Sequence, residues 1–224
     1  MQSHIMPDRV DREVRIPARD VDLQGELKIP QGATGIVIFA HGSGSSRHSS
    51  RNQHVAHILR DSALGTLLFD LLTPEEEIAE QHTRHLRFDI GLLAERLSLA
   101  SAWLRDEEAD NVGIGFFGAS TGGGAALVAA AELGDAVGAV VSRGGRPDLA
   151  GEALARVSAP TLLIVGERDA AVIELNREAF KQLRCEKELR LVPRATHLFE
   201  EPGTLDQVAR LAADWFKRHL QTQK

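Results

Sequence analysis

The chain has 224 residues and a net charge of −6, with 43% hydrophobic and 26% charged residues. These proportions suit a folded domain rather than a disordered chain, and mixed charges argue against binding to nucleic acid or an anionic membrane. No apolar run approaches the ~18 residues that suggest a membrane span, and the polar N-terminus lacks the apolar core of a secretory signal. One cysteine cannot form an intrachain disulfide, and no Cys/His set has zinc spacing. We therefore expect a soluble, cytoplasmic domain without a metal.

Short apolar runs alternate with helical patterns along the chain. Residues 12–17 and 21–30 alternate polar and apolar side chains, which is typical of half-exposed antiparallel strands. Continuous apolar runs follow, as expected for strands that are buried on both faces of a parallel sheet. These runs lie at 35–40, 65–70, 112–117, 139–142, 161–166 and 188–193.

Longer segments carry apolar residues at three- and four-residue steps, which predicts amphipathic helices over 86–105, 170–184 and 205–220. Strands that alternate with helices form βαβ units with right-handed crossovers. We therefore predict an α/β fold with about eight strands in a mostly parallel sheet, helices on both faces, and the first two strands antiparallel at one edge. One domain is expected over residues 11–224, after a flexible segment at 1–10.

The most informative segment is 116–133, where GASTG at 118–122 matches G-x-S-x-G. It lies directly after a predicted strand and before a helix of small residues, the context of a tight strand-to-helix turn that strains the backbone of its serine. Ser120 is therefore the predicted nucleophile, and the alternative is a glycine-rich turn that closes a βα unit. An overlapping G-x-G-x-x-G at 113–118 is not interpreted as a nucleotide site, because its glycines lie within the predicted strand.

A nucleophilic serine in this type of fold works with an acid and a histidine that follow it in the chain. Asp169 comes after the apolar run 161–166, and His197 comes after the next run, 188–193. Both follow strands at the carboxyl edge of the sheet, where open α/β sheets bind ligands. We predict that Ser120, His197 and Asp169 form a catalytic triad. Taken alone, Asp169 could instead cap the next helix and His197 could be an ordinary loop residue.

An acyl-transfer site also needs N–H donors for the negatively charged oxygen of its intermediate. The loop HGSGSS at 41–46 follows the first buried strand and has the HG-x-G form that supplies such donors. We assign the backbone N–H of Ser43, with Gly44 as the alternative, and the N–H of Thr121 just after the nucleophile. The other interpretation of the loop is a flexible polar connection.

Arginines lie near the same edge of the predicted sheet. Arg143 and Arg146 follow the strand after the predicted elbow helix, and Arg47 and Arg51 follow the glycine-serine loop. Arg143 and Arg146 are assigned as substrate-binding residues that would clamp a carboxylate or phosphate; the alternative is pairing with the chain's own Asp and Glu. Asp70, at the end of a strand, could hold such an arginine. Nothing in the spacing of residues suggests a metal or a cofactor.

The segments GASTG, GERDA and ATHLFEEPG, in this order, resemble the α/β-hydrolase superfamily. The longer segments HGSGSSRHSSRN, FFGASTGGGAAL and SRGGRPDLA are similar to the lid-less dienelactone-hydrolase-like group of small bacterial proteins. The resemblance implies an α/β-hydrolase fold without a cap domain, with Ser120 as nucleophile, Asp169 as acid and His197 as base. Dienelactone hydrolases carry a cysteine nucleophile, whereas this chain has serine. Some members of the group are fused to phosphoribosyltransferase domains.

These patterns predict a serine hydrolase that cleaves a small carboxylic ester or lactone through an acyl-enzyme intermediate, without a cofactor. The connections from Asp70 to Leu86 and from Ser142 to Thr161 are too short for a helical cap domain, so the site should be open to water. The alternatives are a thioesterase, lactonase, peptidase or acyltransferase with the same triad, or a non-catalytic small-molecule receptor. We expect a small-molecule partner and neither nucleic acid nor a membrane; the oligomeric state is not indicated.

Overall fold

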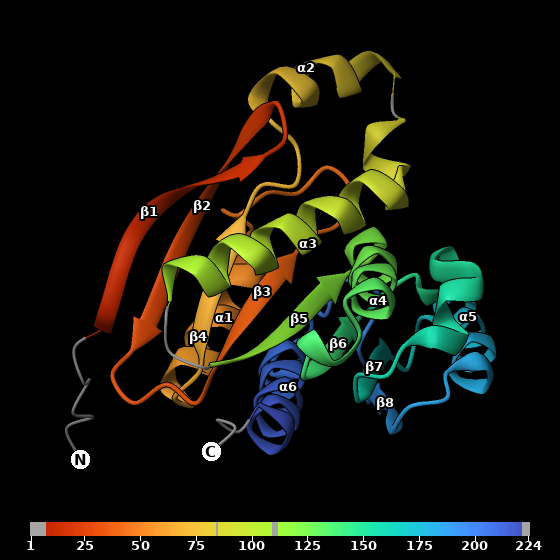
Figure 1. The fold of residues 1–224 in the computed structure, drawn as a ribbon. Coiled ribbons are helices and arrows are strands. Elements are labelled where there is room, and N and C mark those ends of the chain that lie inside the picture. The colour runs from red at the N-terminus through yellow and green to blue at the C-terminus, as the bar shows by residue number, and fades with distance from the viewer. Residues whose placement is uncertain (1–7, 84, 109–111, 221–224) are drawn as a thin grey trace.

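The computed structural model describes residues 8–83, 85–108 and 112–220, which form an eight-stranded sheet in the order β1-β2-β4-β3-β5-β6-β7-β8. The strands are β1 (Asp8–Ala18), β2 (Val21–Pro30), β3 (Gly35–Ala40), β4 (Gly65–Phe69), β5 (Gly113–Ala119), β6 (Ala139–Arg143), β7 (Thr161–Gly166) and β8 (Lys187–Val192). Strand β2 pairs antiparallel with β1 and β4, and all other neighbours are parallel. The predicted mostly parallel sheet with an antiparallel pair at one edge is confirmed (Figure 1).

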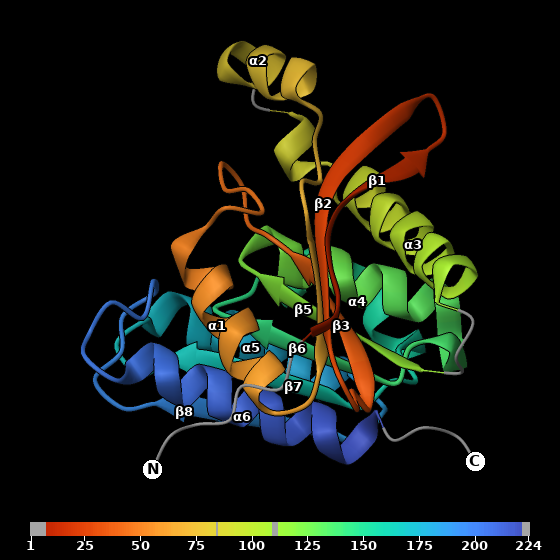
Figure 2. The same cartoon turned by 90° about the vertical axis from the view of Figure 1, so that its left-hand side faces the viewer.

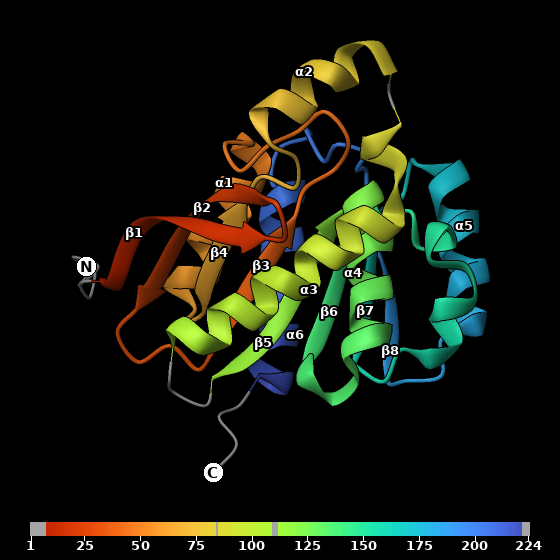
Figure 3. The ribbon, with the colours of Figure 1, turned by 45° about the horizontal axis from the view of Figure 1, so that its top comes forward.

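Helices connect the strands and cover both faces of the sheet, as predicted. The α-helices are α1 (Ser50–Asp61), α2 (Pro74–Thr83), α3 (Ile90–Glu107), α4 (Thr121–Leu133), α5 (Ala170–Gln182) and α6 (Thr204–His219). Short 3₁₀ segments are η1 (Leu86–Phe88), η2 (Gly134–Ala136) and η3 (Pro147–Arg156). Helices α3 and α4 lie on one face, whereas α1 and α6 lie on the other (Figures 2 and 3).

The central strands are apolar throughout because both of their faces are covered. Successive side chains of a strand point to opposite faces. In β3, Ile36 and Ile38 join the core beneath α3 and α4, while Val37 and Phe39 join the core beneath α1 and α6. All residues of β3 are buried. The sheet therefore holds the carboxyl ends of its strands in fixed positions, and the loops that leave those ends build the site.

The edge strand β8 differs from the prediction. Its apolar run indicated burial on both faces, but Arg190 is exposed and Leu191 is 39% exposed. Strand β8 has a single neighbour, β7, and Val192 is its one fully buried residue. Local hydrophobicity does not reveal whether a strand lies at the centre or at the edge of a sheet, because that depends on pairing between distant segments.

The helix predicted over 86–105 is divided in two. Segment η1 ends at Phe88, and α3 begins at Ile90 after the cap residue Asp89. The carboxylate of Asp89 accepts a hydrogen bond from the N–H of Leu92 at 3.0 Å, which satisfies one of the free donors at the helix start. The apolar stripe alone did not reveal this break.

The sequence interpretation also placed no helix at α1 or α2. Helix α2 stands beyond the carboxyl end of the sheet (Figure 2) and is tied to the body by ion pairs. Arg96 of α3 binds Glu76 at 2.6 and 2.7 Å, and Arg87 of η1 binds the fully buried carboxylate of Glu80 at 2.8 Å. As predicted, no cap domain occurs in the described residues, since the β4–α3 connection holds α2 and η1 alone.

The N-terminal boundary needs a correction. Residues 1–7 of the predicted flexible segment 1–10 lie outside the described residues, but residues 8–10 belong to β1 and face β2. Backbone pairing with β2 orders them, which a composition-based boundary misses. No helix in the described part of the chain is long and apolar enough to cross a membrane.

Replacing the cap residue Asp89 by Ala should lower the free energy of unfolding by about 1 kcal/mol, because the N–H of Leu92 loses its acceptor. Urea unfolding followed by circular dichroism measures this change. Asp89→Asn is the matched control, since an asparagine oxygen also caps helices well. Equal losses in both variants would contradict the capping role.

Candidate active site

Ser120 lies in the sharp turn between β5 and α4. Its φ of 52° and ψ of −124° place it in a backbone conformation that non-glycine residues rarely adopt. The flanking glycines are required by close packing: a Cβ at Gly118 would lie 2.4 Å from the carbonyl oxygen of Gly122, and one at Gly122 would lie 2.2 Å from that of Ala40. The G-x-S-x-G pattern therefore has a steric cause in this fold.

Asp169 and His197 meet at the same edge of the sheet. Asp169 follows β7 and His197 follows β8, and Asp169 Oδ2 lies 2.6 Å from His197 Nδ1. Asp169 occupies the cap position of α5, but its side chain makes no capping hydrogen bond. The contact with His197, rather than helix capping, therefore uses this carboxylate.

Ser120 and His197 line one pocket of about 190 Å³. The other lining residues come from the β3–α1 loop, α1, the ends of β5 and β6, and the residue after His197; they are Gly42, Ser43, Ser45, Ser49, Arg51, Asn52, Ala119, Arg143, Gly144 and Leu198. Among the described residues, no hydrogen bond joins Ser120 Oγ to His197. Such bonds are often long without substrate and tighten in the complex. The fold thus brings the predicted nucleophile and base to one pocket, and the predicted acid, Asp169, contacts the base.

The predicted oxyanion donors lie on either side of the elbow. Thr121 is the first residue of α4, so its backbone N–H has no partner within the helix. The backbone N–H of Ser43, the other predicted donor, has a partner in this structure: it donates to Thr121 Oγ1 at 3.1 Å. A Cβ at Gly42 would lie 3.0 Å from Ser120 Cβ, so the loop lies directly against the nucleophile. The Ser43 amide could bind an oxyanion once the Thr121 side chain rotates away from it.

The loop that carries Ser43 is anchored at the end of β4. Buried His41 accepts the N–H of Leu71 on Nε2 at 3.0 Å, and its Nδ1 lies 3.0 Å from the carbonyl oxygen of Gly42. These partners assign a neutral imidazole with its proton on Nδ1. Burial lowers the pKa of His41. Farther along the loop, Asp70 accepts the backbone N–H of Arg47 at 2.7 Å and pairs with its guanidinium, which confirms that Asp70 holds an arginine.

One support of this loop was missed by the sequence interpretation. The hydroxyl of Ser43 donates to the carbonyl oxygen of Arg87 in η1 at 3.1 Å. The guanidinium of Arg87 is in turn held by Glu80 of α2. No local signal reveals this contact, because Ser43 and Arg87 are distant in the chain and meet only in the folded protein.

The two arginines assigned to substrate binding lie in different surroundings. Arg143 is 8% exposed and lines the pocket of Ser120. Arg146 binds the carboxylate of Asp148 with two hydrogen bonds of 2.8 and 2.7 Å, which raise its pKa, and it does not line that pocket. Pairing with the chain's own acids, the alternative interpretation, therefore describes Arg146, whereas Arg143 faces the candidate site.

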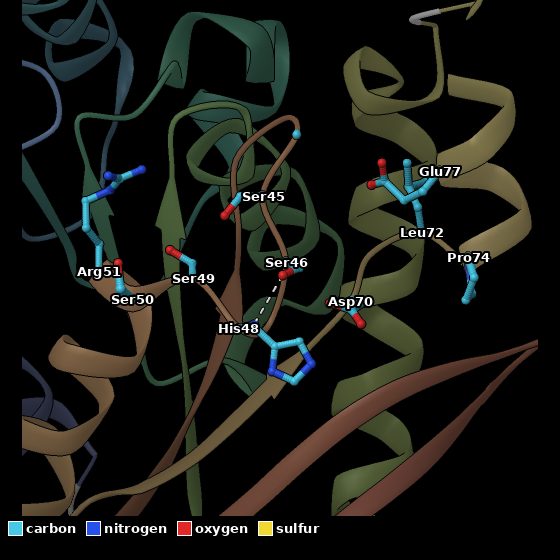
Figure 4. Close-up of a pocket in the computed structure, with 11 residues that line it drawn as sticks. Ser45, Ser46, His48, Ser49, Ser50, Arg51, Asp70, Leu72, Pro74 and Glu77 are labelled. Carbon is cyan, nitrogen blue, oxygen red and sulfur yellow. Dashed lines mark hydrogen bonds between the residues drawn. The ribbon is translucent and has the colours of Figure 1, made fainter. Parts of the chain in front are cut away.

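A larger hollow of about 520 Å³ adjoins the first pocket (Figure 4). The two share Ser45, Ser49 and Arg51, and the larger one extends to Leu72 and to Glu77 of α2. The sequence predicted an open site at this edge. Helix α2 forms the far side of this hollow, which the sequence interpretation did not foresee.

A sequence-family model described as the dienelactone hydrolase family matches residues 69–224 of this chain. These residues include Ser120, Asp169 and His197. The chain belongs to the dienelactone hydrolase family. A solved dienelactone hydrolase from Anabaena variabilis ATCC 29413 is 58% identical, with a TM-score of 0.91, and the comparison covers 95% of this chain and 99% of that one. The resemblance inferred from the sequence segments is confirmed.

Two longer relatives and one distant structural relative extend this comparison. Two proteins of Mycobacterium tuberculosis, from strains CDC 1551 and H37Rv, are 56% identical over 215 residues, 96% of this chain. They are named phosphoribosyl transferases, and the chain spans 48% of their length. A Pyrococcus furiosus esterase is 18% identical with a TM-score of 0.75, covering 94% of this chain and 92% of that one, which is a likeness of fold. The predicted α/β-hydrolase fold is confirmed, and family membership supports a hydrolase.

The buried His41 should make the stability of this family member depend on pH. Its pKa is lowered in the folded state, so below the unfolded value of about 6.5 the unfolded chain binds more protons. The contribution of His41 to stability is present above that pH. It is lost as the pH falls toward the lower pKa that His41 has in the folded state. Unfolding in urea at pH 7.5 and pH 5.5 should therefore show a smaller loss for His41→Gln than for the natural protein.

The exposed His57 offers a control for this measurement. His57→Gln removes an exposed histidine by the same substitution, so its loss of stability between the two pH values is the reference for His41→Gln. If His41→Gln and the natural protein lose equal stability between the two pH values, the neutral buried state of His41 is wrong.

Proposed function

We propose that this chain is a serine hydrolase that cleaves a small carboxylic ester or lactone through an acyl-enzyme intermediate. The observation that carries the proposal is the 2.6 Å contact of Asp169 with His197, in a pocket that His197 shares with Ser120. A strained serine, a histidine and an acid at three strand ends match the needs of nucleophilic acyl transfer. Binding alone would not require all three.

In the proposed reaction, His197 Nε2 takes the proton of Ser120 as Oγ attacks the ester carbonyl. Asp169 accepts a hydrogen bond from the Nδ1–H of His197, which keeps Nε2 free as the base and stabilises the imidazolium that forms. The tetrahedral intermediate collapses, and its alcohol leaves with the proton from His197. Water then attacks the acyl-enzyme with the same histidine as base, and releases the acid and Ser120.

The oxyanion of each intermediate would be bound by the backbone amides of Thr121 and Ser43. Each such donor is worth about 3 kcal/mol in the transition state. The Ser43 amide becomes available when the hydroxyl of Thr121 rotates, since that hydroxyl is its present acceptor. Gly44, the alternative donor in the same loop, has a φ of +69°, and a Cβ there would lie 3.6 Å from Nη1 of Arg87 in η1.

The size and openness of the site favour small substrates and hydrolysis. The pocket at Ser120 holds about 190 Å³, and the adjoining hollow leaves room for an alcohol group. Water can reach an acyl-enzyme in a site without a cap domain. A thioesterase, peptidase or acyltransferase would use the same residues. To separate these activities, turnover is compared among p-nitrophenyl esters, acyl-CoAs, lactones and peptides.

The name of the M. tuberculosis relatives suggests a different chemistry. Those proteins are about twice as long as the matched region, and 156 residues of this chain, 69–224, match the hydrolase family. We therefore assign hydrolysis to the part that this chain represents. Phosphoribosyl transfer by this chain alone, measured with phosphoribosyl pyrophosphate and free bases, should be undetectable.

Replacing Ser120 by Ala should lower ester turnover by at least about 10⁴-fold, because the nucleophile is lost. Hydrolysis of p-nitrophenyl acetate measures the rate, and the mass increase after treatment with a fluorophosphonate reports the attacked serine. Ser98→Ala is the control, since the Ser98 hydroxyl bonds to Ala94 within α3. A variant at 120 that keeps full activity would contradict the mechanism. A natural protein that forms no adduct would favour the receptor alternative.

A further inference from the structure

Glu80 is a buried carboxylate of α2, and both of its oxygens bind η1. Oε1 accepts the N–H of Leu86 at 2.7 Å, and Oε2 accepts the backbone N–H of Arg87 at 3.3 Å and its Nε at 2.8 Å. The Glu80 side chain has no exposed surface. Hydrogen bonds to a charged group are stronger than neutral ones, and a buried carboxylate that lost them would be costly. Glu80 therefore holds η1 in one position.

Segment η1 in turn contacts the loop of Ser43. The hydroxyl of Ser43 donates to the carbonyl oxygen of Arg87 at 3.1 Å, and its oxygen lies 3.0 Å from Thr121 Oγ1. Because a carbonyl has no proton to offer, the Ser43 proton is used toward Arg87, and the hydroxyl of Thr121 must be the donor in the second contact. Thr121 Oγ1 also accepts the backbone N–H of Ser43 at 3.1 Å. Ser43 is thus fixed from two sides, by Arg87 and by Thr121.

The two sides behave differently in the proposed reaction. An oxyanion that binds the Ser43 amide replaces Thr121 Oγ1 as the acceptor, so the contacts of Ser43 with Thr121 are given up in the intermediate. The bond from the Ser43 hydroxyl to Arg87 involves neither the amide nor Thr121. Among the recorded contacts of the Ser43 side chain, the one with Arg87 is therefore the one that persists while charge develops.

Water has little room to replace this bond. A cavity that is lined by Ser43, Arg87 and Thr121 measures about 10 Å³. That volume is at the lower limit for a single water molecule. Much of the remaining lining is apolar, from Leu71, Leu72 and Leu93. A small shift of η1 would therefore leave the Ser43 hydroxyl without an acceptor, and the loop would lose its restraint.

We propose that Glu80 is a positioning residue for the reaction: it holds the Arg87 carbonyl, which tethers Ser43 so that the Ser43 amide stays directed at the oxyanion. The inference rests on the proposed ester hydrolysis, with Ser43 as an oxyanion donor. Donors that are fixed in advance stabilise developing charge without reorienting, and a small displacement forfeits part of that gain. Glu80 does not line the pocket of Ser120, so it acts through Arg87 and Ser43.

Two single variants and their combination test the proposal. Glu80→Gln removes the charge that holds η1, and Ser43→Ala removes the hydroxyl but keeps the backbone amide. Each should lower kcat and kcat/KM for p-nitrophenyl acetate by the same factor, roughly 10- to 100-fold, which is less than the full loss of an oxyanion donor. The combined variant should lose no more than Ser43→Ala alone, because both changes break one chain of contacts. A combined loss equal to the product of the single losses would overturn the proposal, as would full activity in Glu80→Gln.

Glu76→Gln is the matched control, since Glu76 also lies on α2 and binds an arginine, Arg96 of α3. This variant weakens the attachment of α2 and leaves the contacts of η1 intact, so it should lower the urea midpoint but keep the kcat of the natural protein. Equal losses of kcat in Glu76→Gln and Glu80→Gln would indicate a general loosening of α2 and would contradict the proposal. If circular dichroism shows that Glu80→Gln is unfolded, Arg87→Met takes its place beside Ser43→Ala, because it removes the same ion pair from the other side.

Amide hydrogen exchange separates this inference from the proposed function. Measured by mass spectrometry without substrate, the segment 41–46 should exchange at least about 10-fold faster in Glu80→Gln than in the natural protein, and at the natural rate in Glu76→Gln. Unchanged exchange in Glu80→Gln would refute the positioning of Ser43 by Glu80, even in an active hydrolase. If the natural protein neither cleaves esters nor labels at Ser120, the hydrolase is refuted, and the exchange rates alone decide whether Glu80 holds this loop.

Discussion

The candidate site depends on the close approach of α4 to the carboxyl ends of β3 and β5. The space at Gly118 and Gly122 is closed by backbone carbonyl oxygens within 2.4 Å of where a Cβ would lie. Ser120 takes a positive φ to pass through this turn, so its side chain is directed by the backbone rather than by its own contacts. The same approach brings Thr121 against Ser43 and thereby joins the β3–α1 loop to the turn that holds Ser120.

Charge is distributed around this turn in two different ways. Several acidic side chains near this turn are paired with a basic side chain. The pairs are Asp169 with His197, Asp70 with Arg47, and Glu80 with Arg87. These pairs hold His197 and the loop of Ser43 in fixed positions; in the proposed reaction such preorganisation would lower the barrier. Arg143 has no such partner among the described residues, although it lines the same pocket as Ser120.

The elements that the sequence predicted well are those whose residues carry the signal themselves. Strand β3 is apolar along its length because it is buried on both faces, and α6 shows its apolar stripe over almost its whole span. The predictions were wrong where a distant partner decides. Arg190 and Leu191 are exposed because β8 lies at an edge, and α3 starts late because Asp89 caps it. Helix α2 was missed, since a short polar helix held by ion pairs has no strong apolar pattern.

For the site, the sequence by itself determined which residue types occur and in what order: a serine between glycines after a strand, then an acid, then a histidine. Turn geometry and strand ends are local properties, so these positions could be named without coordinates. Only the tertiary structure decided which side chains meet. The pairing of Asp169 with His197, the different surroundings of Arg143 and Arg146, and the support of Ser43 by Arg87 all join distant segments. Such contacts depend on packing of the whole sheet, which no local pattern encodes.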